Sequence, residues 1–515
     1  MRKVYFWVFA ILILLGFADS VFLTWEHYAL TSVGCPVSPW INCLAVTSSK
    51  YSEIFGIPLS LLGSLYYVLL SFFLLQSTKI ENINNKMFKH FFLLTSSFGV
   101  LFSLYLTYIQ AFEIKLFCLY CLASALISFL IFGFSFVVFK RKWKTLFIDS
   151  LGYVYKYLLK PIFFLIDAEV VHVSMVKFGE MLPEEILIIF KSILVKKYSN
   201  LKQQIFGIDF KTPIGLAAGF DYEARLTQVL PLIGFGFETV GTITNSSYEG
   251  NPKPMLGRLP KSQSLLVNKG FKNLGVKETL KRLLGKKFSF PLGISIGRTN
   301  SITLDTLEKS IQDIVTAFKE VKKSRVNNSY FELNISCPNI IHNSGVDFYK
   351  PANLEKLLSA VDKVNLSKPM FIKMPIDQTD KNSLAMLKVI SKHKVKGIIF
   401  GNLQTNKKNK VLVTSEVKKF KMGKYSGKPT FEDSNRLIKL TFKNFKNRFV
   451  IIGCGGVFNA DDAWVKFISG ANLVQLITGM IYEGPQLISQ ISRDLSERLQ
   501  KEGYKNISQI VGSAV

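Results

Sequence analysis

Residues Tyr330–Asn339, with the sequence YFELNISCPN, decide the fold of most of this chain. Tyr330 to Ile335 has the apolar pattern of a buried strand, which ends before Pro338 because proline cannot donate to a sheet ladder. A thiol and two amides at the end of a strand are typical of the way in which a (β/α)8 barrel presents catalytic groups. The alternative for Cys337 is a buried structural thiol.

Seven other strand-like stretches alternate with helix-like segments from Pro213 onward. The eight expected strands are 213–220, 237–244, 291–298, 330–337, 369–376, 395–402, 449–456 and 473–480, with amphipathic segments such as 301–323, 379–393 and 485–502 between and after them. This alternation predicts a (β/α)8 TIM barrel with its site at the carboxyl ends of the strands.

Polar groups and glycines gather at these strand ends. Glycines in the loops after the seventh and eighth strands would let backbone N–H groups close on a phosphate. Lys373 lies in the middle of the fifth strand, and a buried lysine needs an anionic partner. That partner is either a reduced flavin or a structural carboxylate.

Composition divides the chain of 515 residues into an apolar part, 1–139, and a lysine-rich part, 140–515. The length predicts two or more domains. The net charge of +28 suits an anionic membrane surface and phosphate ligands, although a bias towards lysine and asparagine explains most of the excess. Basic residues are not interleaved with aromatic ones in an array, so nucleic acid is not an expected partner.

Four apolar stretches in the first part are each about long enough to cross ~30 Å of hydrocarbon as helices. They are Val4–Trp25, Ile57–Leu75, Phe91–Phe112 and Phe117–Phe139. Basic residues before the first, between the second and third, and after the fourth place these segments in the cytoplasm. They are Arg2, Lys3, Lys79, Lys86, Lys89, Lys140, Arg141, Lys142 and Lys144.

Four of the six cysteines then lie at the outer face, where disulfides persist. Cys118 and Cys121 begin the fourth stretch, where the helix dipole favours the thiolate form. Cys35 and Cys43 flank a seven-residue loop that can carry a mobile second pair. Two pairs on one face predict an electron relay; two static disulfides or a zinc site are the alternatives.

Residues 1–140 resemble the bacterial vitamin K epoxide reductase family. The resemblance rests on these cysteines together with Phe55–Gly63 (FGIPLSLLG) and Ser103–Tyr108 (SLYLTY). It implies an all-α, four-helix bundle in the bacterial inner membrane that oxidises a thioredoxin-like thiol partner outside the cytoplasm and reduces quinone. It makes Cys118 and Cys121 the quinone-side pair, Cys35 and Cys43 the shuttle pair, and Ser49 a contact of the quinone. Asp19, an acid inside the first span, receives no role.

Residues 141–152 are expected to be a basic cytoplasmic linker, and 153–200 a helical extension. The extension alternates apolar residues with Lys and Glu and is interrupted at Pro161 and Pro183. Two short amphipathic helices at the membrane surface fit this pattern, and a helical cap on the following domain is the alternative.

Residues 153–513 resemble dihydroorotate dehydrogenase, and the extension resembles that of its membrane-bound, quinone-dependent class. The motifs that carry the likeness are Gly215–Asp221, Gly270–Gly275, Asn334–Asn339, Ile452–Gly456 and Gly479–Pro485. The resemblance implies an FMN barrel over 201–515 and a quinone tunnel formed by 153–200, where Asp167, Ala168, Glu169 and His172 match the class.

The same resemblance implies roles for individual residues. FMN would be held by Ala218, Gly219, Thr242, Asn334, Lys373, Gly427, Gly455, Gly456, Thr478 and Gly479. The pyrimidine would contact Asn268, Asn334, Asn339 and Asn402. Cys337 would remove the ring proton of the substrate, and Lys373 would stabilise the charge of the reduced flavin. No metal is expected.

Four positions depart from the pattern of the family. Cys337 stands where the quinone class usually has serine, and Tyr222 stands where a lysine usually contacts the carboxylate of the substrate. Asn268 is displaced by one residue after Val267, and Ser295 replaces an asparagine that contacts FMN. Lys269 is a candidate to supply the missing charge.

The sequence therefore predicts two fused oxidoreductases that share membrane quinone. One oxidises dihydroorotate to orotate, a step of de novo pyrimidine biosynthesis, and the other oxidises extracytoplasmic thiols. A barrel acting on another reduced pyrimidine or an enone, and a flavin-binding scaffold without turnover, are the alternatives.

Overall fold

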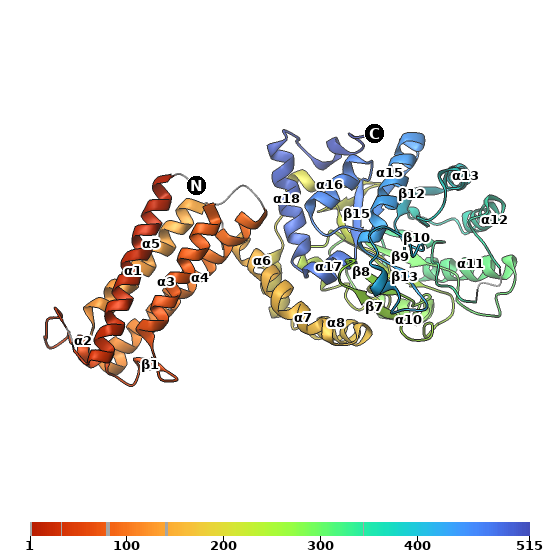
Figure 1. Cartoon of the computed structure of the whole chain (residues 1–515). Helices are drawn as coiled ribbons and strands as arrows, with labels where there is room; N and C mark the ends of the chain where they lie inside the picture. The colour runs from red at the N-terminus through yellow and green to blue at the C-terminus, as the bar shows by residue number, and fades with distance from the viewer. Residues whose placement is uncertain (1–2, 32, 79–82, 140–142, 343–344) are drawn as a thin grey trace. The chain divides into compact units, whose positions relative to one another are not determined.

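The computed structural model describes residues 3–31, 33–78, 83–139, 143–342 and 345–515 (Figure 1). They form two compact units, Met1–Ser150 and Leu151–Val515.

The first unit is a bundle of four long helices. These are α1 (Lys3–Ala29), α3 (Leu59–Thr78), α4 (Ile83–Tyr108) and α5 (Leu119–Phe139), joined by the short α2 (Cys43–Thr47), the hairpin β1 (Glu53–Ile54) and β2 (Ile57–Pro58), and a π-helical turn, Ile109–Ile114. Phe9, Tyr67, Phe92 and Ile131, one from each helix, pack together in its core.

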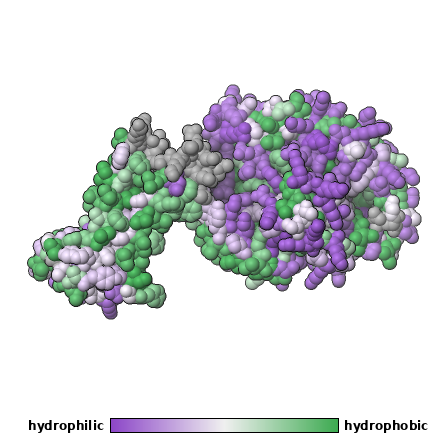
Figure 2. Space-filling model, in the orientation of Figure 1, coloured by the Kyte–Doolittle hydropathy of each residue, from purple (hydrophilic) through white to green (hydrophobic). Residues whose placement is uncertain are grey.

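The bundle exposes apolar side chains that a water-soluble protein would bury. Trp7, Leu14, Phe98 and Leu101 are each more than half exposed, and hydrophobic surface covers most of the bundle in Figure 2. Apolar patches of this extent mark contact with lipid or protein.

Three helical stretches are long and apolar enough to cross a membrane, namely Val4–Ala29, Leu59–Gln76 and Phe88–Ile114. The apolar stretch found in α5, Leu119–Ser135, is shorter. Of the residues that predict the orientation, Arg2, Lys79, Lys140, Arg141 and Lys142 lie outside the described part. The fourth span and the orientation therefore stay predictions.

Helix α6 (Trp143–Val154) and a π-helical turn (Tyr155–Leu159) lead to α7 (Lys160–Leu165), α8 (Ala168–Met181) and α9 (Glu184–Leu194). The predicted break at Pro161 is wrong, because the π-helical turn Tyr155–Leu159 runs directly into α7 and this local change of hydrogen bonding accommodates the missing N–H. The chain instead turns at Ile166, and Asp167 caps α8. The predicted break at Pro183 is confirmed, since Pro183 precedes α9.

All eight predicted strands are present and form a closed parallel barrel. Its strands are β5 (Ile214–Leu216), β6 (Phe237–Ile243), β9 (Leu292–Ile296), β10 (Tyr330–Asn334), β11 (Met370–Met374), β12 (Val395–Phe400), β14 (Val450–Cys454) and β15 (Leu473–Leu476), neighbouring one another in that order. The helices of the unit after the extension are α10 (Val276–Leu283), α11 (Leu307–Lys323), α12 (Pro351–Asp362), α13 (Asp380–Ile390), α14 (Thr414–Val417), α15 (Phe431–Phe445), α16 (Ala460–Ile468), α17 (Thr478–Glu483) and α18 (Leu487–Lys501). The (β/α)8 prediction is confirmed.

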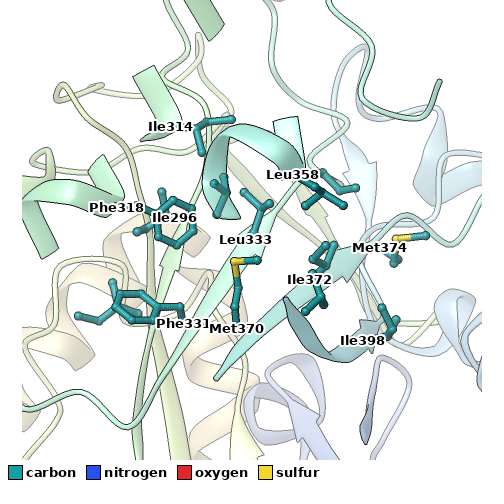
Figure 3. Packing of buried hydrophobic residues seen from close by; sticks show 14 of the residues in the cluster. Ile296, Ile314, Phe318, Phe331, Leu333, Leu358, Met370, Ile372, Met374 and Ile398 are labelled. Carbon is teal, nitrogen blue, oxygen red and sulfur yellow. The ribbon is translucent and has the colours of Figure 1, made fainter. Parts of the chain in front are cut away.

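Alternation along β10 explains why its sequence decides the fold. Phe331 and Leu333 point outward and pack against Ile314 and Phe318 of α11 (Figure 3). Tyr330 packs instead with aromatic rings inside the barrel. Because successive side chains of a strand point to opposite faces, Glu332 and Asn334 also point inside.

Two small sheets complete the unit. The hairpin of β3 (Gln203–Ile205) and β4 (Ile208–Phe210) packs at the amino ends of the barrel strands, where Phe210 meets Phe237. An antiparallel sheet of β7 (Leu256–Leu259), β8 (Ser264–Val267) and β13 (Lys424–Tyr425) packs beside α8.

Candidate functional site

One cavity at the carboxyl ends of the barrel strands gathers nearly all the residues predicted for this unit. Its lining includes Ala218, Gly219, Thr242, Asn334, Cys337, Asn339, Lys373, Asn402, Gly427, Gly455, Gly456, Thr478 and Gly479. These residues come from seven different strands or the loops after them, so only the closed barrel brings them together.

Asn334 and Asn402 are held in place by hydrogen bonds between side chains. The Asn334 Nδ2 donates to Thr242 Oγ1 at 2.8 Å, and the Asn402 Nδ2 donates to Ser336 Oγ at 2.6 Å. Ser336 in turn donates to Asn334 Oδ1 through its hydroxyl, at 2.9 Å. Ser336 was not among the predicted residues, although its place between Asn334 and Cys337 was a signal for it.

Cys337 lies in the same cavity as a free thiol. Burial raises the pKa of Cys337 to about 11, although the backbone at Asn339 and the charge of Lys373 oppose the rise. The thiol is therefore the dominant form at neutral pH, and proton removal by Cys337 needs the minor thiolate form.

Lys373 is buried and lies opposite Asn334 in the register of β10 and β11. Within the described part of the chain, no carboxylate lies within 4.0 Å of its amine. This disagrees with the alternative of a structural lysine–carboxylate pair. An unpaired buried cation facing a cavity suits an anionic ligand.

The glycines after β14 and β15 let two loops approach each other closely. Gly455 and Gly456 have positive φ angles of 100° and 74°. A Cβ on Gly479 would lie 1.9 Å from the carbonyl oxygen of Val457, so only glycine fits there. Together with Lys373, these loops fit the phosphate and the ring of a flavin nucleotide.

The predicted contact Asn268, and Ser295, which replaces an asparagine of the family, are not part of the cavity lining. Asn268 is buried, and its Oδ1 accepts a hydrogen bond from Asn251, which also donates to the carbonyl of Asn339. Asn268 therefore positions the loop of Asn339, and it does not line the cavity. Ser295 is also buried, 2.9 Å from Thr242 Oγ1.

A cluster of charged and aromatic side chains lines another part of the cavity. His172 of α8 stacks on Tyr222, with ring centroids 5.7 Å apart. The Lys269 amine lies 4.5 Å from the centre of the Tyr222 ring and 3.1 Å from the carboxylate of Glu169. Burial, with the charges of Lys269 and Lys272, lowers the pKa of His172 to about 3, so its ring is neutral.

The wall beside this cluster is apolar. It is formed by Leu256 of β7, Leu265 and Val267 of β8, Phe220 and Ile481. Because His172 reaches the same cavity from α8, the helical extension contributes directly to the site.

The four predicted cysteines of the first unit also lie together. Cys35 and Cys43 form a disulfide, with Cα atoms 6.1 Å apart, whereas Cys118 and Cys121 are free. Cys43 and Cys118 are buried in one cluster, and the Cys121 amide donates to Cys118 Sγ. The disulfide leaves two thiols, too few for the four-thiolate zinc alternative.

A second cavity lies within the bundle next to Cys121. Its lining includes Ser49, His27, Tyr67 and Cys121. The predicted quinone contact Ser49 and the predicted quinone-side thiol therefore face one space, whereas the tyrosine and histidine were not predicted.

Comparison with known protein families gives one match on each side of the boundary between the two units. The model of the family "Dihydroorotate dehydrogenase" matches residues 200–499, and that of the "Vitamin K epoxide reductase family" matches 7–136. Both resemblances expected from the sequence are confirmed.

Individual relatives match the second unit. The dihydroorotate dehydrogenase (quinone) of Christiangramia forsetii is 35% identical over 352 residues, which cover 67% of this chain and 99% of the relative. That of Trichodesmium erythraeum is 34% identical over 328 residues, 62% of this chain and 84% of the relative.

The fold is also that of a solved structure. The crystal structure of the Eimeria tenella DHODH in complex with ferulenol superposes with a TM-score of 0.57 at 24% identity, covering 68% of this chain and 96% of that one. The chain therefore belongs to the dihydroorotate dehydrogenase family, and its N-terminal unit carries a segment of the vitamin K epoxide reductase family.

Proposed function

We propose that the second unit oxidises dihydroorotate to orotate with FMN and passes the electrons to membrane quinone. The observation that carries this proposal is the convergence of Cys337, Lys373, the amides and the glycine loops on one cavity. The names of the relatives support the substrate and the acceptor.

The residues of the cavity have different roles in the proposed reaction. Asn334, Asn339 and Asn402 hold the amide edges of the pyrimidine, and the Cys337 thiolate takes a proton from the ring carbon. Bound FMN supplies the hydride acceptor. Lys373, the unpaired buried cation, stabilises negative charge that develops opposite it.

Lys269 supplies the charge that Tyr222 lacks. The Lys269 amine lies over the Tyr222 ring and 3.5 Å from the Tyr222 hydroxyl. A cation from the loop after β8 therefore reaches the place where the family usually has a lysine at position 222. Lys269 and Lys272 both pair with the carboxylate of Glu169. This group of three therefore keeps one net positive charge for the carboxylate of the substrate.

Quinone reaches the cavity along α8 and the apolar wall of β7 and β8. Exposed apolar side chains on the extension, such as Leu165, Phe178 and Met181, suit a membrane surface. A quinone ring needs an apolar path with few polar groups, and this side of the cavity provides one.

The first unit transfers electrons from extracytoplasmic thiols to quinone. External thiols reduce the Cys35–Cys43 disulfide, and the resulting thiols reduce a disulfide between Cys118 and Cys121. That pair then gives two electrons and two protons to a quinone in the cavity lined by Ser49. We place four helices across the inner membrane, with the cysteines outside and the barrel in the cytoplasm.

The direct test uses the purified full-length chain with its bound flavin, without oxygen. Dihydroorotate should bleach the flavin absorbance, and added quinone should restore it. Dihydrouracil, which lacks the carboxylate, should bleach the flavin far more slowly. A flavin that dihydroorotate leaves oxidised would contradict the proposal, and one that prefers dihydrouracil would favour another reduced pyrimidine as substrate.

A further inference from the structure

A carboxylate is buried inside the barrel beside the predicted flavin contacts. Glu332 is fully buried and lies two residues before Asn334 on the same face of β10. Its Oε1 accepts a hydrogen bond of 2.7 Å from Ser295 Oγ. Its Oε2 is buried and has no hydrogen bond within the described residues. A carboxylate in such a place is costly, and no step of the proposed reaction uses it.

Glu332 ends a continuous chain of hydrogen bonds that leads to the cavity. Ser295 Oγ lies 2.9 Å from Thr242 Oγ1, to which the Asn334 Nδ2 donates at 2.8 Å. Ser336 then donates to Asn334 Oδ1 and accepts from Asn402 Nδ2. The chain therefore joins the carboxylate to both amides proposed to hold the pyrimidine.

Groups at two places give this chain of hydrogen bonds its direction: Glu332 accepts from Ser295, and the backbone N–H of Ser336 donates to Asn334 Oδ1 at 3.1 Å. The hydroxyl of Ser295 donates to Glu332 Oε1, so its one hydrogen points to Glu332. Ser295 can then only accept from Thr242, so the Thr242 hydroxyl hydrogen is also used. Thr242 must then accept from an N–H of Asn334, which is the same orientation of the Asn334 amide that the Ser336 backbone N–H requires.

The remaining bonds follow from that orientation. The oxygen of Asn334 faces Ser336 and takes its hydroxyl hydrogen, so Ser336 must accept from an N–H of Asn402. Both amides are thereby oriented, and each offers a known set of atoms to a ligand in the cavity.

We propose that Glu332 is a positioning residue of this site. It acts through Ser295 and Thr242, together with the backbone N–H of Ser336, to hold Asn334 and Asn402 in one orientation, and it touches no ligand itself. The inference rests on the proposed function for the identity of the ligands, flavin and orotate.

Two substitutions separate this role from simple packing. Glu332→Gln keeps the size of the side chain, but its amide can also donate to Ser295, so the hydroxyl of Ser295 is no longer held as a donor at the end of the chain of hydrogen bonds. Ser295→Ala keeps the carboxylate of Glu332 and removes the hydroxyl that joins it to Thr242. If Glu332 acts through this chain of hydrogen bonds, both substitutions remove the same contribution to orotate binding, and their effects are not additive.

The experiment measures binding to the full-length chain in detergent. The flavin is removed, FMN is titrated back by its fluorescence, and orotate is then titrated by the change in the flavin spectrum. We expect Glu332→Gln and Ser295→Ala each to weaken binding of orotate about tenfold, in line with one lost buried hydrogen bond. The double variant should bind orotate no more weakly than the single variant with the lower affinity.

Glu238→Gln is the matched control. Glu238 is also fully buried, but it lies on β6, which β9 separates from β10, and on the outer face of that strand beside Asp221. It has no hydrogen bond to the chain of bonds that starts at Glu332, within the described residues. Orotate binding should be unchanged in this variant.

Wild-type affinity in Glu332→Gln, or additive losses in the double variant, would overturn the inference. If Glu332→Gln does not fold, Ser295→Ala alone decides, because unchanged orotate affinity in that variant also overturns it. A wild-type chain that binds FMN and orotate without turning over dihydroorotate would contradict the proposed function and leave this inference standing.

Discussion

The ionisation of Cys337 should make the rate of the proposed reaction depend on pH. In the proposed reaction the thiolate is the active form, and burial raises the pKa of Cys337 to about 11. The rate constant for flavin reduction should therefore rise with pH throughout the range from 6 to 9, about tenfold for each unit. Stopped-flow measurements of flavin bleaching by dihydroorotate would show a plateau below pH 8 if another group were the base.

The same residue can be tested by removal. Cys337→Ala should slow flavin reduction by about 10²–10⁴-fold, the usual contribution of a general base. The amount of FMN bound per chain should not change, because Cys337 is not among the proposed flavin contacts. A variant that loses both rate and flavin would indicate a structural thiol instead.

Lys269 is the residue on which substrate choice should depend. Loss of one charge-assisted hydrogen bond costs about 1.5–3 kcal/mol, so Lys269→Met should raise the KM for dihydroorotate about tenfold or more. The KM for the methyl ester of dihydroorotate, which has no charge to recognise, should change little.

Lys272→Met is the comparison for this prediction. Lys272 also pairs with Glu169, but its amine lies 3.7 Å from the Glu169 carboxylate, compared with 3.1 Å for Lys269, and its side chain is more exposed than that of Lys269. The effect of Lys272→Met on the KM should be smaller. Equal effects on the acid and its ester in Lys269→Met would mean that Lys269 does not recognise the carboxylate.

At the scale of elements, α8 links the extension to the site through Glu169 and His172. Asp167 caps this helix by accepting hydrogen bonds from the amides of Glu169 and Val170, at 2.9 and 3.1 Å. Asp167→Ala should destabilise α8 by about 1 kcal/mol. Because α8 forms one side of the proposed quinone path, the KM for quinone should rise more than the KM for dihydroorotate.

Two further variants control for the loss of a cap in general. Asp167→Asn keeps an acceptor and should behave as the wild type. Thr306→Ala removes the corresponding bond from α11, far along the barrel sequence, and should lower stability without affecting quinone. Steady-state kinetics at varied quinone, with thermal unfolding measured alongside, distinguish these outcomes.

At the scale of the whole molecule, two compact units carry two separate cavities, each with its own redox groups. We expect the two activities to be independent, because each unit reduces quinone on its own. Cys118→Ala should abolish oxidation of an external dithiol and leave the bleaching of the flavin by dihydroorotate unchanged. A loss of both activities would show that electrons pass between the units.

Most of the barrel could be predicted from the sequence because its signals are local. Period-two alternation, as in Tyr330–Asn334, reveals each strand, and glycines or prolines reveal the strand ends. The same reasoning failed at Pro161, because a π-helical turn just before it lets the helical run continue past the proline. Only the course of the backbone shows such a turn.

The sequence by itself determined the two families, the eight strands and the residue types that meet at the site, since each depends on neighbours along the chain. Tertiary structure alone decided which of these residues share a wall. Closure of the barrel leaves Asn268 behind the cavity, places the Lys269 amine over Tyr222, and joins Glu332 to Asn334 through Ser295 and Thr242. Such contacts join residues that are far apart in the chain, and no local pattern encodes the distances between them.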